Sequence, residues 1–166
     1  MRGGLVPSLY TFLGERIMAM STDDDLLKYQ PEILNYGIDE FTEEHAKARA
    51  DILRKLRSEW WNKAKTYNAF PGNSKYAEMD ETKLTESQFN RVAVFRVLSE
   101  YVLPQLTKWN NENEEDKFQV MMKHYEKRYK TEFAEILLDG VEYDFDGDGT
   151  VQDDERGSIH SKRLTR

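Results

Sequence analysis

Residues 144–155 are the part of the sequence whose side-chain types and spacing could do chemistry. They read Asp-Phe-Asp-Gly-Asp-Gly-Thr-Val-Gln-Asp-Asp-Glu, which fits the calcium-loop pattern at every position that the pattern specifies. Calcium prefers roughly six to eight oxygen ligands, and the pattern supplies carboxylates on alternate residues, a glycine where the chain turns and a closing bidentate acid. The predicted ligands are Asp144, Asp146, Asp148, the main-chain carbonyl of Thr150, Gln152 through a water molecule, and Glu155. Calcium is therefore the cofactor that the spacing indicates.

The same run also has a simpler interpretation as a solvated acidic turn. Aspartate tolerates left-handed backbone conformations and glycine favours them, so Asp-Gly-Asp-Gly is common in turns without an ion. Gly140 lies four residues before the first ligand and Gly157 two residues after the last, and neither flanking helix is well supported. Because such a loop closes on its ion at a larger entropy cost, any calcium affinity should be on the order of 10⁻⁴ to 10⁻³ M. Both interpretations stay open at the level of the sequence.

Long amphipathic helices are expected to position this loop. The first is predicted over residues 42–64, with Thr42 as its cap and apolar positions at steps of three and four. These positions are Ala46, Ala50, Leu53, Leu56, Trp60 and Ala64. The opposite face is basic and is interpreted as a solvated surface. Upstream, Pro31 and Gly37 interrupt the pattern, so residues 26–36 predict two short helical turns.

Two further helices are predicted downstream. Thr85 and Gln88 form a capping-box pattern, in which each side chain would bond the main-chain N–H of the other. The apolar stretch that follows predicts a central helix, which Pro104 ends or kinks. The last helix is predicted from a cap at Asn113 to a terminator at Gly140. Its apolar stripe consists of Phe118, Met121, Met122, Tyr125, Tyr129, Phe133, Ile136 and Leu137.

These elements predict an all-α fold. We expect a small helical bundle of three to four main helices, with an extended C-terminal arm that carries the EF-hand-like loop. Residues 1–20 are interpreted as an N-terminal extension, residues 21–138 as the bundle, and residues 139–166 as the acidic loop followed by a basic docking arm. Met20 looks like a natural start, which suggests an added or mis-assigned leader before it.

The overall composition excludes several classes of function. With 31 acidic and 24 basic residues the net charge is −7, which disfavours binding to nucleic acid by counterion release. The chain has no cysteine, so disulfides and zinc–thiolate sites are excluded. No apolar stretch approaches the length that spans a bilayer, so we expect a soluble protein without a membrane partner. The three histidines, His45, His124 and His160, show no metal spacing and are interpreted as surface residues, and we expect no enzymatic activity.

Two sets of side chains are candidates for binding a partner. Trp61 follows Trp60, which continues the apolar stripe, and should therefore point away from the core toward an interface. The C-terminal tail reverses the charge of the loop, since residues 139–155 hold eight acids and no base while residues 156–166 hold no acid. Its bases are Arg156, Lys162, Arg163 and Arg166. Such a tail can fold back on the acidic loop or reach an acidic groove on another subunit.

Together these segments resemble the head-tail adaptor, or connector, proteins of tailed bacteriophages. The resemblance rests on three segments: the opening run at residues 24–34, the long basic-faced helix that ends in Trp60-Trp61, and the closing run Tyr129–Leu138 with the acidic loop and Lys162-Arg163-Leu164. It covers most of residues 20–166.

The resemblance implies a structural virion protein in the neck between capsid and tail. Such subunits form a ring, typically of about twelve copies, beneath the portal protein. Their C-terminal segment docks into the portal, and their outer face receives tail or stopper proteins. DNA passes through the ring without being read. The family does not require a calcium loop, so ion binding rests on the spacing of residues 144–155 alone.

A second class of function is a soluble calcium-binding regulator in which the helices form the effector surface. Calcium sensors generally pair two loops that support each other, and the sequence contains no second Asp-x-Asp-x-Asp-Gly run. The presence of a single loop favours the assembly protein over the calcium-binding regulator.

Overall fold

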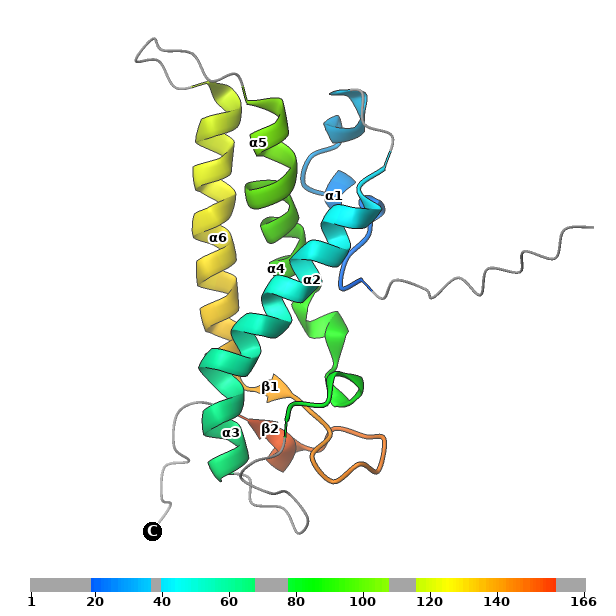
Figure 1. Ribbon diagram of the computed structural model, residues 1–166, viewed down its shortest axis with the longest axis vertical. Helices are drawn as coiled ribbons and strands as arrows, with labels where there is room; N and C mark the ends of the chain where they lie inside the picture. The colour runs from blue at the N-terminus through cyan, green and yellow to red at the C-terminus, as the bar shows by residue number, and fades with distance from the viewer. Residues whose placement is uncertain (1–18, 37–39, 68–77, 108–115, 158–166) are drawn as a thin grey trace, which may run out of the picture.

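The computed structural model describes residues 19–36, 40–67, 78–107 and 116–157, which form a mostly helical bundle (Figure 1). Two of its three rods are helices joined end to end through π-helical turns. The first consists of α2 (Thr42–Leu56), a π-helical turn (Arg57–Trp61) and α3 (Asn62–Tyr67). The second consists of α4 (Asn90–Arg96), a π-helical turn (Val97–Val102) and α5 (Leu103–Leu106), and the third is α6 (Lys117–Asp139). The predicted helical bundle is confirmed.

Short elements complete the described chain. They are α1 (Asp23–Leu27), four 3₁₀ turns (Ile33–Tyr36, Glu81–Lys83, Glu86–Phe89 and Asp153–Glu155) and the strands β1 (Val141–Glu142) and β2 (Arg156–Gly157). The two predicted turns within residues 26–36 are therefore present. The strands pair antiparallel, with Val141 opposite Gly157, and enclose the acidic loop between them. This pairing was not expected, because two-residue strands leave no periodic signal in a sequence.

Helix α6 forms as predicted along its apolar stripe. Five of the eight stripe residues are buried, namely Tyr125, Tyr129, Phe133, Ile136 and Leu137, and the other three pack against the core. The predicted cap is wrong: α6 begins at Lys117, and the carboxylate of Asp116 accepts the N–H of Phe118 at 3.1 Å. Asn113 itself lies outside the described residues. The helix ends at Gly140, whose φ of +112° is open to glycine but strained for other residues.

The first rod buries four of the six residues of its predicted stripe, namely Leu53, Leu56, Trp60 and Ala64, and departs from the prediction only near its start. Ala50 is exposed and Ala46 half-buried, while Ala48 and Ile52 lie in the core. The stripe begins at Phe41, which is also the residue that precedes the helix, so Thr42 is its first helical residue rather than its cap. In this part of the helix the predicted and the observed buried residues both recur at steps of three and four. Only packing against the other rods distinguishes the two sets.

The predicted capping box at Thr85 and Gln88 does not form. The side chain of Gln88 instead reaches across the molecule to β1, where its Nε2 donates to the carbonyl oxygen of Gly140 at 2.9 Å. Its Oε1 accepts the main-chain N–H of Glu142 at 3.0 Å. Gln88 thus satisfies two main-chain groups just after α6, where the helix ladder has ended.

The second rod does not end at Pro104, and the irregular part of its helix lies before this residue. A π-helical turn, Val97–Val102, directly precedes it, and α5 continues to Leu106. Proline lacks an N–H and clashes with the carbonyl four residues earlier, and a π-helical turn is one way in which a helix accommodates that defect.

The three rods share one core, which extends into the segment before α1. Met20 is 4% exposed and belongs to this core, so the predicted boundary at residue 20 lies one residue inside the packed region. Among the described helices, none combines the length and apolarity that crossing a membrane requires. The core also includes Val141, Tyr143 and Phe145, which attach the acidic loop to the lower end of the bundle in Figure 1.

Candidate functional site

The acidic loop begins from a main-chain framework that joins it to the segment before α4. The N–H of Asp144 donates to the carbonyl of Lys83 at 2.9 Å, and the N–H of Thr85 donates to the carbonyl of Glu142 at 3.1 Å. Leu84 and Tyr143 form a β-bridge between these bonds. The first ligand of the predicted loop is therefore held in place by a segment about sixty residues earlier in the chain.

Three aspartates converge within the loop. One carboxylate oxygen from each of Asp144, Asp146 and Asp148 lies within 4.8 Å of the other two. Asp144 is half-buried, while Asp146 and Asp148 are exposed. Gly147 and Gly149, with φ of +79° and +90°, allow the reversals that bring alternate residues to one side. Oxygen ligands of this kind suit a hard divalent cation, so the cluster could bind a metal ion.

Main-chain hydrogen bonds hold these carboxylates in position. Asp144 accepts the N–H of Gly147 at 2.6 Å and that of Gly149 at 3.0 Å. Asp148 accepts both the N–H and the hydroxyl of Thr150, at 2.8 and 2.7 Å. These bonds from Thr150 lower the pKa of Asp148, so its carboxylate stays ionised and able to coordinate a cation.

Glu155, the predicted twelfth-position ligand, is not part of the aspartate cluster. It is 1% exposed, and its carboxylate accepts three main-chain N–H groups from the loop: those of Phe145 at 2.8 Å, Asp146 at 3.1 Å and Gln152 at 2.9 Å. These bonds turn its carboxylate toward the loop backbone, and its predicted role as a direct ligand stays a prediction. In this conformation Glu155 closes the loop internally.

The other two predicted ligands are placed beside the cluster. The side chain of Gln152 donates to Asp148 at 3.3 Å, and Thr150 bonds Asp148 through its hydroxyl. The prediction that Gln152 acts through a water and Thr150 through its carbonyl stays a prediction.

The prediction that Trp61 faces a partner is wrong for the described chain, because this side chain is 4% exposed. Its ring lies 5.1 Å from that of Tyr143 and is stacked at 6.1 Å on that of Phe145. Trp60 contacts the same two rings, so both tryptophans are covered by the loop. A π-helical turn, with its i→i+5 bonds, places neighbouring side chains closer in angle than an α-helix does, so both can face inward. We call Trp60, Trp61, Tyr143 and Phe145 the aromatic cluster.

Of the predicted basic contacts in the tail, the structure describes one. Arg156 is half exposed, and its guanidinium lies 3.2 Å from the carboxylate of Glu142 on the paired strand. This residue therefore folds back on its own chain, which is one of the two outcomes expected for the tail. Lys162, Arg163 and Arg166 lie outside the described residues.

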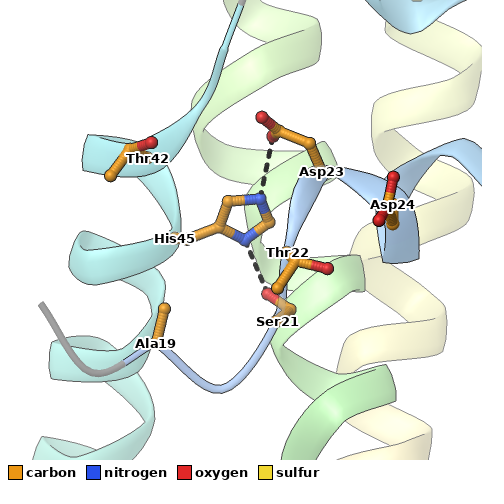
Figure 2. A pocket seen from close by; sticks show the side chains of 7 residues that line it. All are labelled: Ala19, Ser21, Thr22, Asp23, Asp24, Thr42 and His45. Carbon is orange, nitrogen blue, oxygen red and sulfur yellow. Dashed lines mark hydrogen bonds and ion pairs between the residues drawn. The ribbon is translucent and has the colours of Figure 1, made fainter. Parts of the chain in front are cut away.

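His45 was expected at the surface but is 3% exposed (Figure 2). Its Nδ1 lies 2.7 Å from the hydroxyl of Ser21, and its Nε2 lies 3.1 Å from the carboxylate of Asp23. These are the residue types of a nucleophilic triad. Ser21 is only 2% exposed, however, and Asp23 also accepts the N–H of Phe41, so the three side chains act as a tie between the start of α1 and the start of α2.

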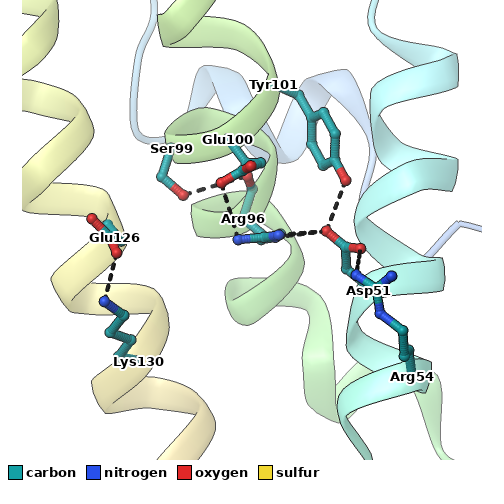
Figure 3. Close-up of polar contacts among 8 residues, drawn as sticks. All are labelled: Asp51, Arg54, Arg96, Ser99, Glu100, Tyr101, Glu126 and Lys130. Atoms are coloured by element: carbon teal, nitrogen blue, oxygen red, sulfur yellow. Dashed lines mark hydrogen bonds and ion pairs between the residues drawn. The ribbon is translucent and has the colours of Figure 1, made fainter.

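A second polar cluster ties α2 to the central rod (Figure 3). Asp51 accepts bonds from Arg96 at 2.6 Å and from the hydroxyl of Tyr101 at 2.7 Å, and it also pairs with Arg54. Burial and the bond to Asp51 raise the pKa of Tyr101 to about 12. Although burial opposes it, the pKa of Asp51 is lowered by the donors from Tyr101 and Arg96. Every charge in this cluster is matched, which indicates a structural role.

No protein-family model, curated protein or solved structure matches this chain. The function therefore has to be argued from the loop, the aromatic cluster and the distribution of charge.

Proposed function

We propose that the chain is a subunit of a head-tail adaptor ring of a tailed bacteriophage, which joins the portal protein to tail or stopper proteins in the neck of the virion. In this proposal the helical bundle is the rigid body of the subunit, and residues 139–166 form its docking arm. The role is structural rather than enzymatic, and DNA passes through the ring without sequence-specific contacts.

The observation that carries this proposal is the attachment of the arm to the bundle. The aromatic cluster, and the two hydrogen bonds from the Gln88 side chain to Gly140 and Glu142, hold the first part of the arm against the end of the rods. A binding segment that leaves from a rigid base loses less conformational entropy when it docks than one that leaves from a mobile linker. The basic residues that follow would then reach a partner from a defined point.

The charge of the chain suits a subunit that surrounds DNA without holding it. A net charge of −7 repels the phosphate backbone on average, so an anionic lumen would discourage adhesion during packaging and ejection. The same charge would have to be compensated where subunits contact each other or the portal.

We further propose that calcium occupies the aspartate cluster and stiffens the docking arm. Three carboxylates within 4.8 Å of one another repel, and a divalent cation would remove that repulsion. Because Glu155 is engaged by main-chain N–H groups, the ion would either be held without it, as a weak site, or draw it out of those bonds.

Calcium binding is tested by titrating the purified chain with Ca²⁺ in a calorimeter. A second titration uses Tb³⁺, because bound Tb³⁺ luminesces when a nearby tryptophan is excited. The variant D146N/D148N removes two cluster carboxylates, and D153N/D154N removes the same charge from exposed positions outside the cluster. We expect the first variant to lose binding and the second to retain it within about threefold, since exposed charges outside the cluster attract the ion only through screening solvent. Equal loss in both variants would mean diffuse attraction of cations rather than a site.

The adaptor role is tested by mixing the chain with portal protein of the same phage and measuring mass by light scattering. We expect a stable complex whose electron micrographs contain closed rings with a central hole. A chain that ends at Gly157 keeps the loop and the aromatic cluster but lacks the distal bases, and it should bind portal much more weakly. If the full chain leaves the portal mass unchanged, the proposal fails.

The second candidate is a calcium-binding regulator, and one observation favours it. Phe145 lies between two ligand aspartates in sequence and stacks on Trp61, so a change at the loop would reach the core of the bundle. A calcium-dependent exposure of apolar surface, detected with a dye such as ANS and combined with no portal binding, would favour this candidate.

A further inference from the structure

Helix α6 changes the sign of its charge near its midpoint. Residues 117–130 hold five bases, Lys117, Lys123, Lys127, Arg128 and Lys130, and one acid, Glu126, for a net charge of +4. Residues 131–155, which complete α6 and include the acidic loop, hold ten acids and no base. Because α6 runs along the length of the bundle in Figure 1, the two regions lie toward opposite ends of the molecule.

The basic half of α6 is presented to solvent. All five of its basic residues are exposed, and Lys130 forms its ion pair with Glu126 within the same helix at 2.5 Å (Figure 3). On the acidic side, Glu135 and Asp139 are exposed on α6 itself, before the loop begins. We call residues 117–130 the basic half and residues 131–155 the acidic end.

The outer face of α6 also carries two exposed apolar side chains. Of the three large exposed apolar residues in the described part of the chain, two are Val120, at 53%, and Leu138, at 49%. They are eighteen residues apart, which is about five helical turns, so they lie on one line along the helix. One belongs to the basic half and the other to the acidic end.

From this arrangement we infer that the basic half of α6 is a docking surface for the acidic end of a second copy of this chain. The occupant is indicated by charge: the net +4 of one region meets the exposed acids of the other, while like regions repel. These exposed acids are Glu135, Asp139, Asp146, Asp148, Asp153 and Asp154. Val120 and Leu138 add apolar contact to each such pairing. The copies therefore associate with basic half against acidic end, and not with matching ends together.

The inference deepens the proposed ring, on which it rests for its biological setting. A contact between two different regions of one surface is heterologous, and such a contact generates a ring when the repeated rotation closes on itself. Used twice between two copies, the same contact gives an antiparallel dimer. The contact itself is testable on the isolated chain under either arrangement.

The experiment uses charge reversal in pairs. K123E/K127E lowers the net charge of the basic half from +4 to 0, and E135K/D139K reduces that of the acidic end from −10 to −6 without touching the aspartate cluster. A fourfold variant combines both. Self-association of each purified full chain is measured by light scattering and sedimentation at ionic strengths of about 0.05 and 0.5 M, since the higher one screens surface charge. The matched control is K47E/K63E, which changes the net charge as K123E/K127E does, on exposed positions of α2 and α3.

We expect the wild-type chain to self-associate at low salt, and each paired reversal to weaken association by about tenfold or more. An equimolar mixture of the two paired variants should recover association, because the intact basic half of one variant then meets the intact acidic end of the other. The fourfold variant, whose basic half is neutral, should stay weakened, and the control should resemble the wild type. Circular dichroism verifies that each variant is folded. A wild-type chain that stays monomeric, or a mixture of the two paired variants that does not recover, would overturn the inference.

Portal binding measured in parallel separates this inference from the proposed function. If both paired reversals still form rings with portal, the docking surface is wrong while the adaptor role stands. If the wild-type copies associate as expected but do not bind portal, the adaptor role fails and the contact stands.

Discussion

Replacing Trp61 with alanine should destabilise the protein strongly, because this side chain joins the first rod to the acidic loop. Trp61 is 4% exposed and contacts the rings of Trp60, Tyr143 and Phe145 at centroid distances of 5.7, 5.1 and 6.1 Å. An indole of this size buries roughly 150–250 Å², which at about 25 cal/mol per Å² corresponds to about 4–6 kcal/mol of transfer free energy.

The expected loss of unfolding free energy is about 3–5 kcal/mol, the range for removing buried Phe or Trp side chains. A domain of this size is usually stable by about 5–15 kcal/mol, so the variant should be folded but marginal. Trp61→Phe keeps a stacked ring and should lose roughly 1–2 kcal/mol, because part of the volume is retained.

Urea unfolding followed by far-ultraviolet circular dichroism measures these losses as a fall in midpoint. With a slope of about 1–3 kcal/mol per molar urea, Trp61→Ala should lower the midpoint by roughly 1–5 M. Val120→Ala is the control, since Val120 is 53% exposed and its truncation should cost less than about 1 kcal/mol. A loss for Trp61→Ala as small as that of the control would refute the burial argument and restore Trp61 as a candidate for a partner interface.

Three further outcomes follow from the polar contacts. Replacing Gln88 with leucine leaves two main-chain groups beyond α6 without their partner, and should lower the unfolding free energy by about 1–3 kcal/mol in urea; no change would mean that water replaces the side chain. Asp51→Asn should lower the pKa of Tyr101 from about 12 toward 10, and NMR of labelled tyrosine measures this pKa. The raised pKa of Tyr101 adds to the unfolding free energy of the wild type below about pH 10, and this contribution is lost as pH rises through about 12. The variant should therefore receive a smaller contribution from Tyr101. If the Tyr101 hydroxyl titrates at the same pH in the variant, the assigned bond to Asp51 is contradicted. Burial raises the pKa of Asp25, but hydrogen-bond donors, among them Lys28 and Asn90, outweigh burial and hold this pKa at about 2. The contribution of Asp25 to the unfolding free energy is therefore complete above about pH 4 and is lost as pH falls through 2. Asn90→Ala should move acid unfolding, measured by circular dichroism, to higher pH, and an unchanged acid midpoint would exclude this link.

The sequence predicts those parts of the fold that depend on neighbours along the chain. The stripe of α6 extends over five turns and ends at a glycine, and both features hold because one helix face packs against one core. The aspartate cluster is equally local, since alternate carboxylates and two glycines determine its shape within a few residues. These are the cases in which short-range geometry is sufficient.

The remaining features depend on residues that are far apart in sequence. Gln88 resembles a capping residue, yet it bonds β1 more than fifty residues later. Trp61 has an exposed position on an ideal helix, but a π-helical turn and the rings of Tyr143 and Phe145 bury it. His45 looks like a surface histidine until Ser21 and Asp23 are placed beside it. A local pattern contains no information about such partners.

The aromatic cluster has a consequence for the synthesis of the protein. Trp60 and Trp61 leave the ribosome roughly eighty residues before Tyr143 and Phe145, which at about 5–20 residues per second is a delay of about 4–16 seconds. During that interval the two indole rings lack the contacts that Tyr143 and Phe145, in the last quarter of the chain, make with them. Versions of the gene that stop before Tyr143 should therefore yield insoluble product, whereas a stop codon after Gly157 should not.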